Sequence, residues 1–496
     1  MPAPNAQQQI QNTPIKIVGG NLFGRYPKIS VEQTFNMIVS DEALVPYAGY
    51  KSVLTQSTAQ KGRGLYASSR GNRMVAVWGS GVYSITGSGG IFAAQFIGSL
   101  ATNVGDVYMA ENNSGQVAIT DGINIYGYNW TLPPTLLSSN GGGITIPAAL
   151  KNPGYISFQN GRFIVADTTS KNWYLSAAND VTNFPAASAN IGSLESKPDT
   201  VQAVLPTPGG GNNIVVFGHT VMEQWQDIGA ALFPYQRSST SNVDFGTINA
   251  SSIAALDNYI VWLAMNESSG VSLMIYAGNN AQRISTDGLD YKLASLSNPE
   301  NCSAFLFRQD GHIIYQFTFI EDNLSYIYDI TTKQFFTVTD EALNYHPAKN
   351  VVFFQNKYYF VSLNGGDLYE LGTNITDIEY SDGVNHIIPQ IRITAPLRMP
   401  DQRMFIIKSI GFTVENGQQA NPITPPDTSA AIDLSISRNG GESFGTSVRI
   451  DMNPNGKRTS RFIYQRLGQA NDVTFQIKFI GYQRFVAFDG VAEVYV

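Results

Sequence analysis

HIIYQFTFIEDNLSYIYD, residues 312–329, contains two short apolar strands rich in aromatic residues, with a polar turn between them. The preceding segment, AFLFRQDGH, adds a third strand that ends in an Asp-Gly pair. Asp-Gly supplies the positive φ angles that a two-residue hairpin turn requires. These three strands predict most of one four-stranded antiparallel sheet.

This strand–turn–strand unit recurs along the chain and can be identified seven times. The copies begin at Arg73, Gln116, Arg162, Asn213, Tyr259, His312 and Lys357. Their spacing of roughly 40 to 55 residues is close to the length of a four-stranded propeller blade. The pattern therefore predicts an all-β fold with a β-propeller of about seven blades, in which aromatic side chains pack between neighbouring blades.

The two ends of the chain do not continue the repeat. Residues 1–60 contain strand-like runs, and we expect this N-terminal segment to complete a propeller blade. Residues 61–386 form the propeller repeats. Residues 387–496 contain five or more strands and predict a C-terminal β-sandwich.

Charge is scarce and unevenly distributed. Only 14% of the residues are charged, and 31 Lys and Arg against 38 Asp and Glu give a net charge of -7. Residues 391–496 contain 12 Lys and Arg and 9 Asp and Glu, a net charge of +3, which leaves 19 against 29, or -10, for the remainder. The chain thus lacks the overall basic charge of a nucleic-acid binder.

Several classes of chemistry are disfavoured by residue content. Cys302 is the only cysteine, which excludes an intrachain disulfide and a cysteine-rich zinc site. The four histidines are scattered without metal-binding spacing, so we expect no metal site and no cofactor. The N-terminus does not resemble a secretory signal, and no run approaches the roughly 18 to 20 apolar residues of a membrane span.

One motif suggests an alternative function. Residues 437–444, SRNGGESF, resemble the S-x-D-x-G-x-T-W turn of sialidase-type propellers, with matches or replacements at Ser437, Asn439, Gly441 and Phe444. Asn439 replaces the aspartate and Phe444 the tryptophan. That turn is structural and not catalytic, so we predict a structural hairpin. A carbohydrate-binding or sialidase-like propeller is the alternative function, and a propeller acting only as an interaction scaffold is a third.

Other candidate motifs have simpler explanations. The glycine clusters at residues 141–143 and 209–211 lack the flanking residues of phosphate-binding loops. Three pairs of acidic residues, at 321–322, 340–341, and 377 with 379, lie at predicted turns, where solvated carboxylates are common. We predict no catalytic residues and no enzymatic activity.

A basic run, GKRTSRFIYQR, contains Lys457, Arg458, Arg461 and Arg466. In a regular strand, Arg458 and Arg466 would share one face while Lys457 and Arg461 share the other. Two readings stay open: a solvated strand edge protected by charge, or a contact with an acidic partner subunit or a phosphate backbone.

The C-terminal residues resemble the tail-hub proteins of short-tailed phages, also called nozzle or packaged-DNA stabilisation proteins. A strand with Ser437, Gly440 and Gly441 is followed by the spaced arginines and the turn Arg466-Leu467-Gly468. Near the N-terminus, Asn36 and Met37 lie in FNMIVS, which is similar to the opening strand of that family.

The resemblance implies a non-enzymatic virion protein of the phage tail, assembled in the host cytoplasm. It implies a homo-oligomeric ring, a hexamer, below the portal and its adaptor protein, with tail fibre, tailspike or needle proteins attached below. Such a ring extends the DNA channel and helps to retain the packaged genome. Double-stranded DNA passes through it transiently, without sequence-specific binding, and net acidity fits a conduit that should not hold DNA tightly.

Overall fold

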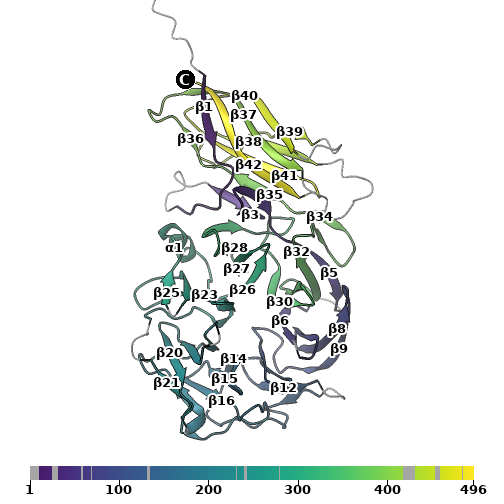
Figure 1. The fold of residues 1–496 in the computed structure, drawn as a ribbon, viewed down its shortest axis with the longest axis vertical. Helices are drawn as coiled ribbons and strands as arrows, with labels where there is room; N and C mark the ends of the chain where they lie inside the picture. Colours follow the sequence, from purple (N-terminus) through teal and green to yellow (C-terminus); the bar gives the residue numbers. More distant parts are fainter. Residues whose placement is uncertain are drawn as a thin grey trace, which may run out of the picture.

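The computed structural model describes residues 10–24, 32–56, 60–68, 70–130, 135–209, 211–230, 232–238, 243–278, 280–416, 430–452, 459–482 and 484–496. Within these residues, the only α-helix is α1 (Asp287–Ala294), and almost all other regular structure is β-strand. The strands form a ring of blades with a second domain attached to its rim (Figure 1). This all-β architecture confirms the fold class predicted from the repeats.

The ring contains seven blades, counted over the described residues, each an antiparallel meander of four strands. In chain order the blades comprise β6 (Gly62–Ser68), β7 (Arg73–Trp78), β8 (Gly81–Ser88) and β9 (Ile91–Ser99); β10 (Tyr108–Glu111), β11 (Gln116–Thr120), β12 (Ile125–Asn129) and β13 (Leu137–Ser138); β14 (Pro153–Gln159), β15 (Arg162–Asp167), β16 (Asn172–Leu175) and β17 (Ile191–Ser193); β18 (Ala203–Pro206), β19 (Asn213–Phe217), β20 (Met222–Asp227) and β21 (Tyr235–Arg237); β22 (Ala254–Leu256), β23 (Tyr259–Ala264), β24 (Ser272–Ala277) and β25 (Asn280–Arg283); β26 (Cys302–Gln309), β27 (His312–Phe319), β28 (Leu324–Asp329) and β29 (Gln334–Thr337); and β30 (Ala348–Phe354), β31 (Lys357–Ser362), β32 (Asp367–Gly372) and β5 (Gly49–Thr55). The first strand of each blade lies nearest the ring axis, and the last lies at the rim (Figure 1).

The seven sequence repeats are the two middle strands of the seven blades. The first is β7 with β8, and the last is β31 with β32. The predicted hairpin turns have the expected backbone: Asn160 and Gly161 have φ of 47° and 81°, and Asp310 and Gly311 have φ of 47° and 90°. These positive φ values are those of the two-residue turns that match strand twist.

The hydrophobic cores lie between blades, because each blade packs one face on each neighbour. Trp173 of blade 3 makes an edge-to-face contact with Trp225 of blade 4, at 5.7 Å between ring centroids. Phe217 of blade 4 makes a similar contact with Trp262 of blade 5, at 5.2 Å. Clusters of buried residues join every neighbouring pair of blades around the ring.

The ring is closed by the N-terminal part of the chain. Strand β5 pairs antiparallel with β32 over the length from Gly49 to Thr55 and supplies the rim strand of blade 7. Strand β33 (Asp377–Glu379) then pairs parallel with β5, and β34 (Asn385–Ile387) pairs with β33. Two segments far apart in sequence thus complete one blade.

The second domain is a sandwich of two sheets (Figure 1). The first sheet contains β3 (Met37–Ser40), β4 (Ala43–Pro46), β42 (Phe485–Tyr495), β37 (Phe405–Asn416) and β40 (Thr459–Ala470), with β1 (Ile10–Ile15) also paired to β42. The second contains β35 (Gln390–Ile393), β41 (Asp472–Ile480), β38 (Ala431–Ser437) and β39 (Val448–Asp451), with β36 (Leu397–Arg398) paired to β41. Between them lies a core that includes Phe412, Phe475 and Ile477.

The second sandwich sheet is continuous with blade 6. Strand β2 (Gln33–Phe35) pairs parallel with β29 of the blade and antiparallel with β35 of the sandwich. The N-terminal segment therefore contributes β1, β3 and β4 to the sandwich and β5 to the propeller, with β2 between them. Domain boundaries at residues 60 and 387 remain predictions. No helix in the described ranges has the length and apolar character needed to cross a membrane.

Candidate functional site

The junction between propeller and sandwich is organised by Asn36, which follows β2. Its side chain is 1% exposed, and its backbone has φ of 54°, a left-handed conformation that Asn tolerates better than most residues. The side-chain Nδ2 donates to Thr339 Oγ1 at 2.9 Å and to Pro389 O at 3.0 Å. Oδ1 accepts from the backbone N–H of Thr339 at 2.8 Å. One side chain thus connects Thr339, which follows blade 6, to Pro389, which precedes strand β35 of the sandwich.

Met37, the next residue, lies in the sandwich core with none of its surface exposed. The sequence predicts Asn36 and Met37 together in one strand. The structure separates their roles, because Asn36 holds the junction and Met37 packs inside the sandwich. That they mark an N-terminal strand characteristic of the family remains a prediction.

A buried arginine supports the same junction. Arg392, on β35, has no exposed side-chain surface, and its Nη2 donates to Glu32 Oε2 at 2.8 Å and to Lys16 O at 3.3 Å. Its Nη1 donates to Thr34 Oγ1 at 3.1 Å and to Gly20 O at 3.2 Å. Burial lowers the pKa of the guanidinium, and the Glu32 carboxylate opposes that effect. The ion pair fastens the N-terminal segment to the sandwich beside β2.

Sequence reasoning missed Arg392. The available signal was an arginine between two isoleucines in QIRI, residues 390–393, where a charged side chain interrupts an apolar strand. A buried arginine is tolerated only with partners. Those partners come from residues more than 350 positions earlier in the chain, so the sequence pattern alone did not reveal them.

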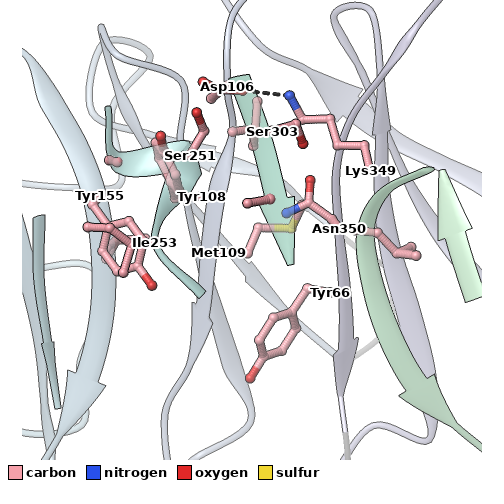
Figure 2. A pocket seen from close by; sticks show the side chains of 15 residues that line it. Tyr66, Asp106, Tyr108, Met109, Tyr155, Ser251, Ile253, Ser303, Lys349 and Asn350 are labelled. Carbon is pink, nitrogen blue, oxygen red and sulfur yellow. Dashed lines mark hydrogen bonds and ion pairs between the residues drawn. The ribbon is translucent and has the colours of Figure 1, made fainter. Parts of the chain in front are cut away.

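The propeller axis contains a small cavity of about 140 Å³, lined by the inner strands of several blades. Lys349 of blade 7 and Asp106, which precedes β10 of blade 2, form an ion pair across it at 2.5 Å (Figure 2). Tyr66, Met109 and Asn350 also line this space (Figure 2). The propeller axis is thus narrow and crossed by side chains.

The Ser437 turn of the sandwich is closed by its own hydrogen bonds. Ser437 Oγ accepts from Gly441 N at 2.9 Å, and Asn439 Oδ1 accepts from Ser443 N at 3.1 Å. Asn439 therefore makes the turn-closing contact that an aspartate could also make. Phe444 is partly buried. The polar groups of the turn therefore bond within the turn, and its role as a structural hairpin remains a prediction.

The described basic residues lie on the edge strand of the first sandwich sheet. Arg461 and Arg466 are both exposed on β40, although a regular strand would point them to opposite faces. Arg466 has φ of 60° beside an irregularity in the pairing of β37 with β40, and this bulge shifts the alternation. Lys457 and Arg458 lie outside the described residues. The role of all four as subunit or phosphate contacts remains a prediction.

One acidic pair holds loops together, whereas Asp377 and Glu379 lie on strand β33 and not at the turn predicted for them. Glu321 Oε1 accepts from Asn298 and Asn301 side chains, and Asp322 accepts from the backbone N–H of Ser297, which lowers the pKa of Asp322. Burial raises the pKa of the Cys302 thiol to about 12, which keeps it protonated and unreactive. In the part of the chain that the structure describes, no group of three His, Cys, Asp or Glu side chains could hold a metal ion.

Fold and junction together define a two-domain β-protein in which a seven-bladed propeller carries a β-sandwich on its rim. A family model described as "Bacteriophage P22 Gp10, beta-propeller" matches residues 22–376, and a second, "Bacteriophage P22 Gp10, beta-sandwich", matches residues 390–494. The chain belongs to the bacteriophage P22 Gp10 family and is a structural protein of the phage tail. Both the family resemblance and the two-part architecture expected from the sequence are confirmed.

Comparison with solved structures gives weaker similarities. The WD40 β-propeller domain of Doa1 has 11% identity and a TM-score of 0.41, covering 66% of this chain and 98% of that one. The computationally designed Ika8 protein has 12% identity and a TM-score of 0.37, covering 72% of this chain and 99% of that one. A comparison with curated proteins found no match.

Proposed function

We propose that this protein is the hub, or nozzle, of a short phage tail. Six copies form a ring below the portal and its adaptor, extend the DNA channel, help to retain the packaged genome, and carry tail fibre, tailspike or needle proteins below. The protein acts without enzymatic activity, and the ring assembles in the host cytoplasm. Membership of the P22 Gp10 family is the observation on which this proposal depends.

The narrow propeller axis bears on where a DNA channel could lie. A DNA duplex, whose major groove alone is about 12 Å wide, does not fit a cavity of about 140 Å³ crossed by the Asp106–Lys349 ion pair. If the protein forms a DNA channel, the channel therefore lies between subunits. Head-to-tail contacts that close by rotation produce such a ring.

The charge distribution supports one orientation of neighbours. Residues 391–496 have a net charge of +3, whereas the rest of the chain has a net charge of -10. Opposite charges favour contact between the sandwich of one copy and the propeller of the next. In the described part of this basic region, Arg461 and Arg466 are exposed on β40 and available for such contact.

Negative-stain imaging of the full chain, mixed with portal–adaptor complex, tests the proposal. We expect ring density directly below the adaptor. A chain that stays single and does not bind the complex would contradict it.

Charge reversal tests the electrostatic part separately. We expect the triple change Arg458→Glu, Arg461→Glu and Arg466→Glu to prevent ring formation, while Arg70→Glu, at an exposed turn of blade 1, leaves it intact. Normal rings from the triple variant would show that these arginines do not contact a neighbouring subunit.

A further inference from the structure

The rim strands of the propeller are protected in nearly every blade. In blades 2 to 5 the last strand is short, with 2, 3, 3 and 4 residues in β13, β17, β21 and β25. In blades 6 and 7 the rim strands are covered by β2 and β33. Short or covered edges are the devices by which natural β-proteins avoid unwanted strand pairing.

Blade 1 is the exception. Its rim strand β9 contains 9 residues, and in the described structure it pairs only with β8. The free side of β9 therefore presents unpaired backbone N–H and C=O groups. Residues 74–105, which include β8 and β9, contain no Asp, Glu, Lys or Arg. This edge lacks both a cover and the charges that normally discourage pairing.

The side chains of β9 add an apolar surface to that edge. Ile91 is 82% exposed and Phe96 is 55% exposed, and Ala93 and Gln95 are exposed between them. The opposite side chains anchor the strand, because Phe92 packs against Tyr359 of blade 7 at 5.2 Å and Ile97 is buried. The edge is consequently held in place before any partner arrives, which reduces the entropy cost of binding.

Two edge strands of the sandwich are protected, among the residues that the structure describes. Strand β40, with 12 residues, carries Arg461 and Arg466, and Arg438 donates to its carbonyl oxygens at Leu467 and Gln469. Strand β1 contains Pro14, which has no N–H to offer. Among the described rim strands of the propeller, β9 is thus the long, uncharged one whose outer edge has no paired strand.

We propose that β9 is a subunit interface, where an extended segment from a second copy of this chain adds a strand to blade 1. Strand addition occurs twice at the same rim position within the chain, since β2 extends blade 6 and β33 extends blade 7, both in parallel orientation. Blade 1 is next in the ring after blade 7. Each copy has a net charge of -7, and an uncharged edge can meet a second copy without placing like charges side by side. This inference rests on the proposed ring.

Hydrogen–deuterium exchange on the full chain tests the interface. Exchange is measured on the dilute chain and on the chain assembled on the portal–adaptor complex. An added strand would form hydrogen bonds with the free amides of β9. We therefore expect those amides of residues 91–99 to exchange at least about tenfold more slowly in the assembly than in the dilute chain. Assembled rings whose β9 amides exchange as in the dilute chain would overturn the inference and leave the proposed function standing.

A matched pair of lysine variants provides the second measurement. Ala93→Lys with Gln95→Lys places like charges on the β9 edge, and we expect it to weaken self-association about tenfold or more. Gln236→Lys changes an exposed glutamine on the short rim strand β21 and should leave self-association unchanged. If both variants self-associated equally strongly, the inference would be overturned. It would also be overturned if the β9 amides became protected only when a different tail protein was bound. Failure of any ring to form would contradict the proposed function as well.

Discussion

The propeller and the sandwich use the same antiparallel strands but build their cores in different ways. In the propeller, each cluster of buried residues is shared by two neighbouring blades, as Phe217 and Trp262 show for blades 4 and 5. In the sandwich, a single core lies between two sheets. A propeller blade therefore depends on its neighbours, whereas the sandwich contains the partners that it needs for its own core.

The N-terminal segment makes the two regions interdependent. It supplies β5 to close the propeller and β1, β3 and β4 to the sandwich, and Asn36 lies where these uses meet. The comparison teaches that local packing stabilises each domain, while the junction holds their relative position. Three measurements test that distinction, beginning with the largest expected effect.

Substitution of Trp262 by alanine should damage the propeller most. Its side chain is fully buried between blades 4 and 5, and its Nε1 donates to Gly246 O at 2.9 Å. We expect Trp262→Ala to lower the free energy of unfolding of the propeller by about 3–5 kcal/mol, because it leaves a cavity between blades. Denaturant unfolding, monitored by hydrogen exchange, measures how much free energy of unfolding each domain loses.

Phe412→Ala, at a buried position of the sandwich core, is the matched variant. It should reduce the protection of amides in β37 and β42 while the propeller keeps its own. If either variant lowered protection equally in both domains, the two cores would behave as one cooperative unit and the comparison would be wrong.

The junction itself is tested at Asn36. Asn36→Ala removes three hydrogen bonds and places a Cβ-bearing residue without a polar side chain at φ of 54°. We expect a loss of about 3 kcal/mol, from the unpaired buried groups and the left-handed backbone together. Asn36→Gly removes the same bonds and tolerates the backbone, so it should be less damaging. An alanine variant no worse than the glycine variant would show that the backbone conformation is unimportant.

A pH effect should appear at the closing blade. His346 is 1% exposed, faces the rings of Tyr47 and Tyr50, and burial lowers its pKa to about 3. The unfolded chain binds a proton at His346 below about pH 6.5, while the folded chain does not until near pH 3. The free energy of unfolding is therefore unaffected by His346 above about pH 6.5. Below that pH it decreases, and at pH 5 it is about 2 kcal/mol lower than at neutral pH.

Unfolding measured at pH 7 and pH 5 checks this prediction. His346→Phe removes the titrating group, so its stability should depend less on pH over the same interval. An unchanged difference between pH 7 and pH 5 in that variant would assign the effect to other groups.

The proposed contact surfaces were less predictable from the sequence than the blades. Sequence parity placed Arg461 and Arg466 on opposite faces, yet both are exposed because a bulge near Arg466 shifts the alternation. A bulge depends on how β40 pairs with β37, which no local pattern reports. The β9 edge shows the same limit, because its neutrality is visible in the sequence but its lack of a covering strand is visible only in the sheet order.

Local sequence was sufficient for the blades, since alternating apolar residues, tight-turn pairs such as Asn160-Gly161 and a regular repeat act over a few residues. The propeller class, the sandwich and their division of charge were all readable at that level. Tertiary structure alone decided which distant segments pair. Strand β5 closes blade 7, β2 connects blade 6 to β35, and Arg392 meets Glu32, across separations of more than 300 residues. Such contacts depend on the packing of the whole chain. Each partner pairs an open strand edge, or a buried polar group, that would otherwise have no hydrogen-bond partner.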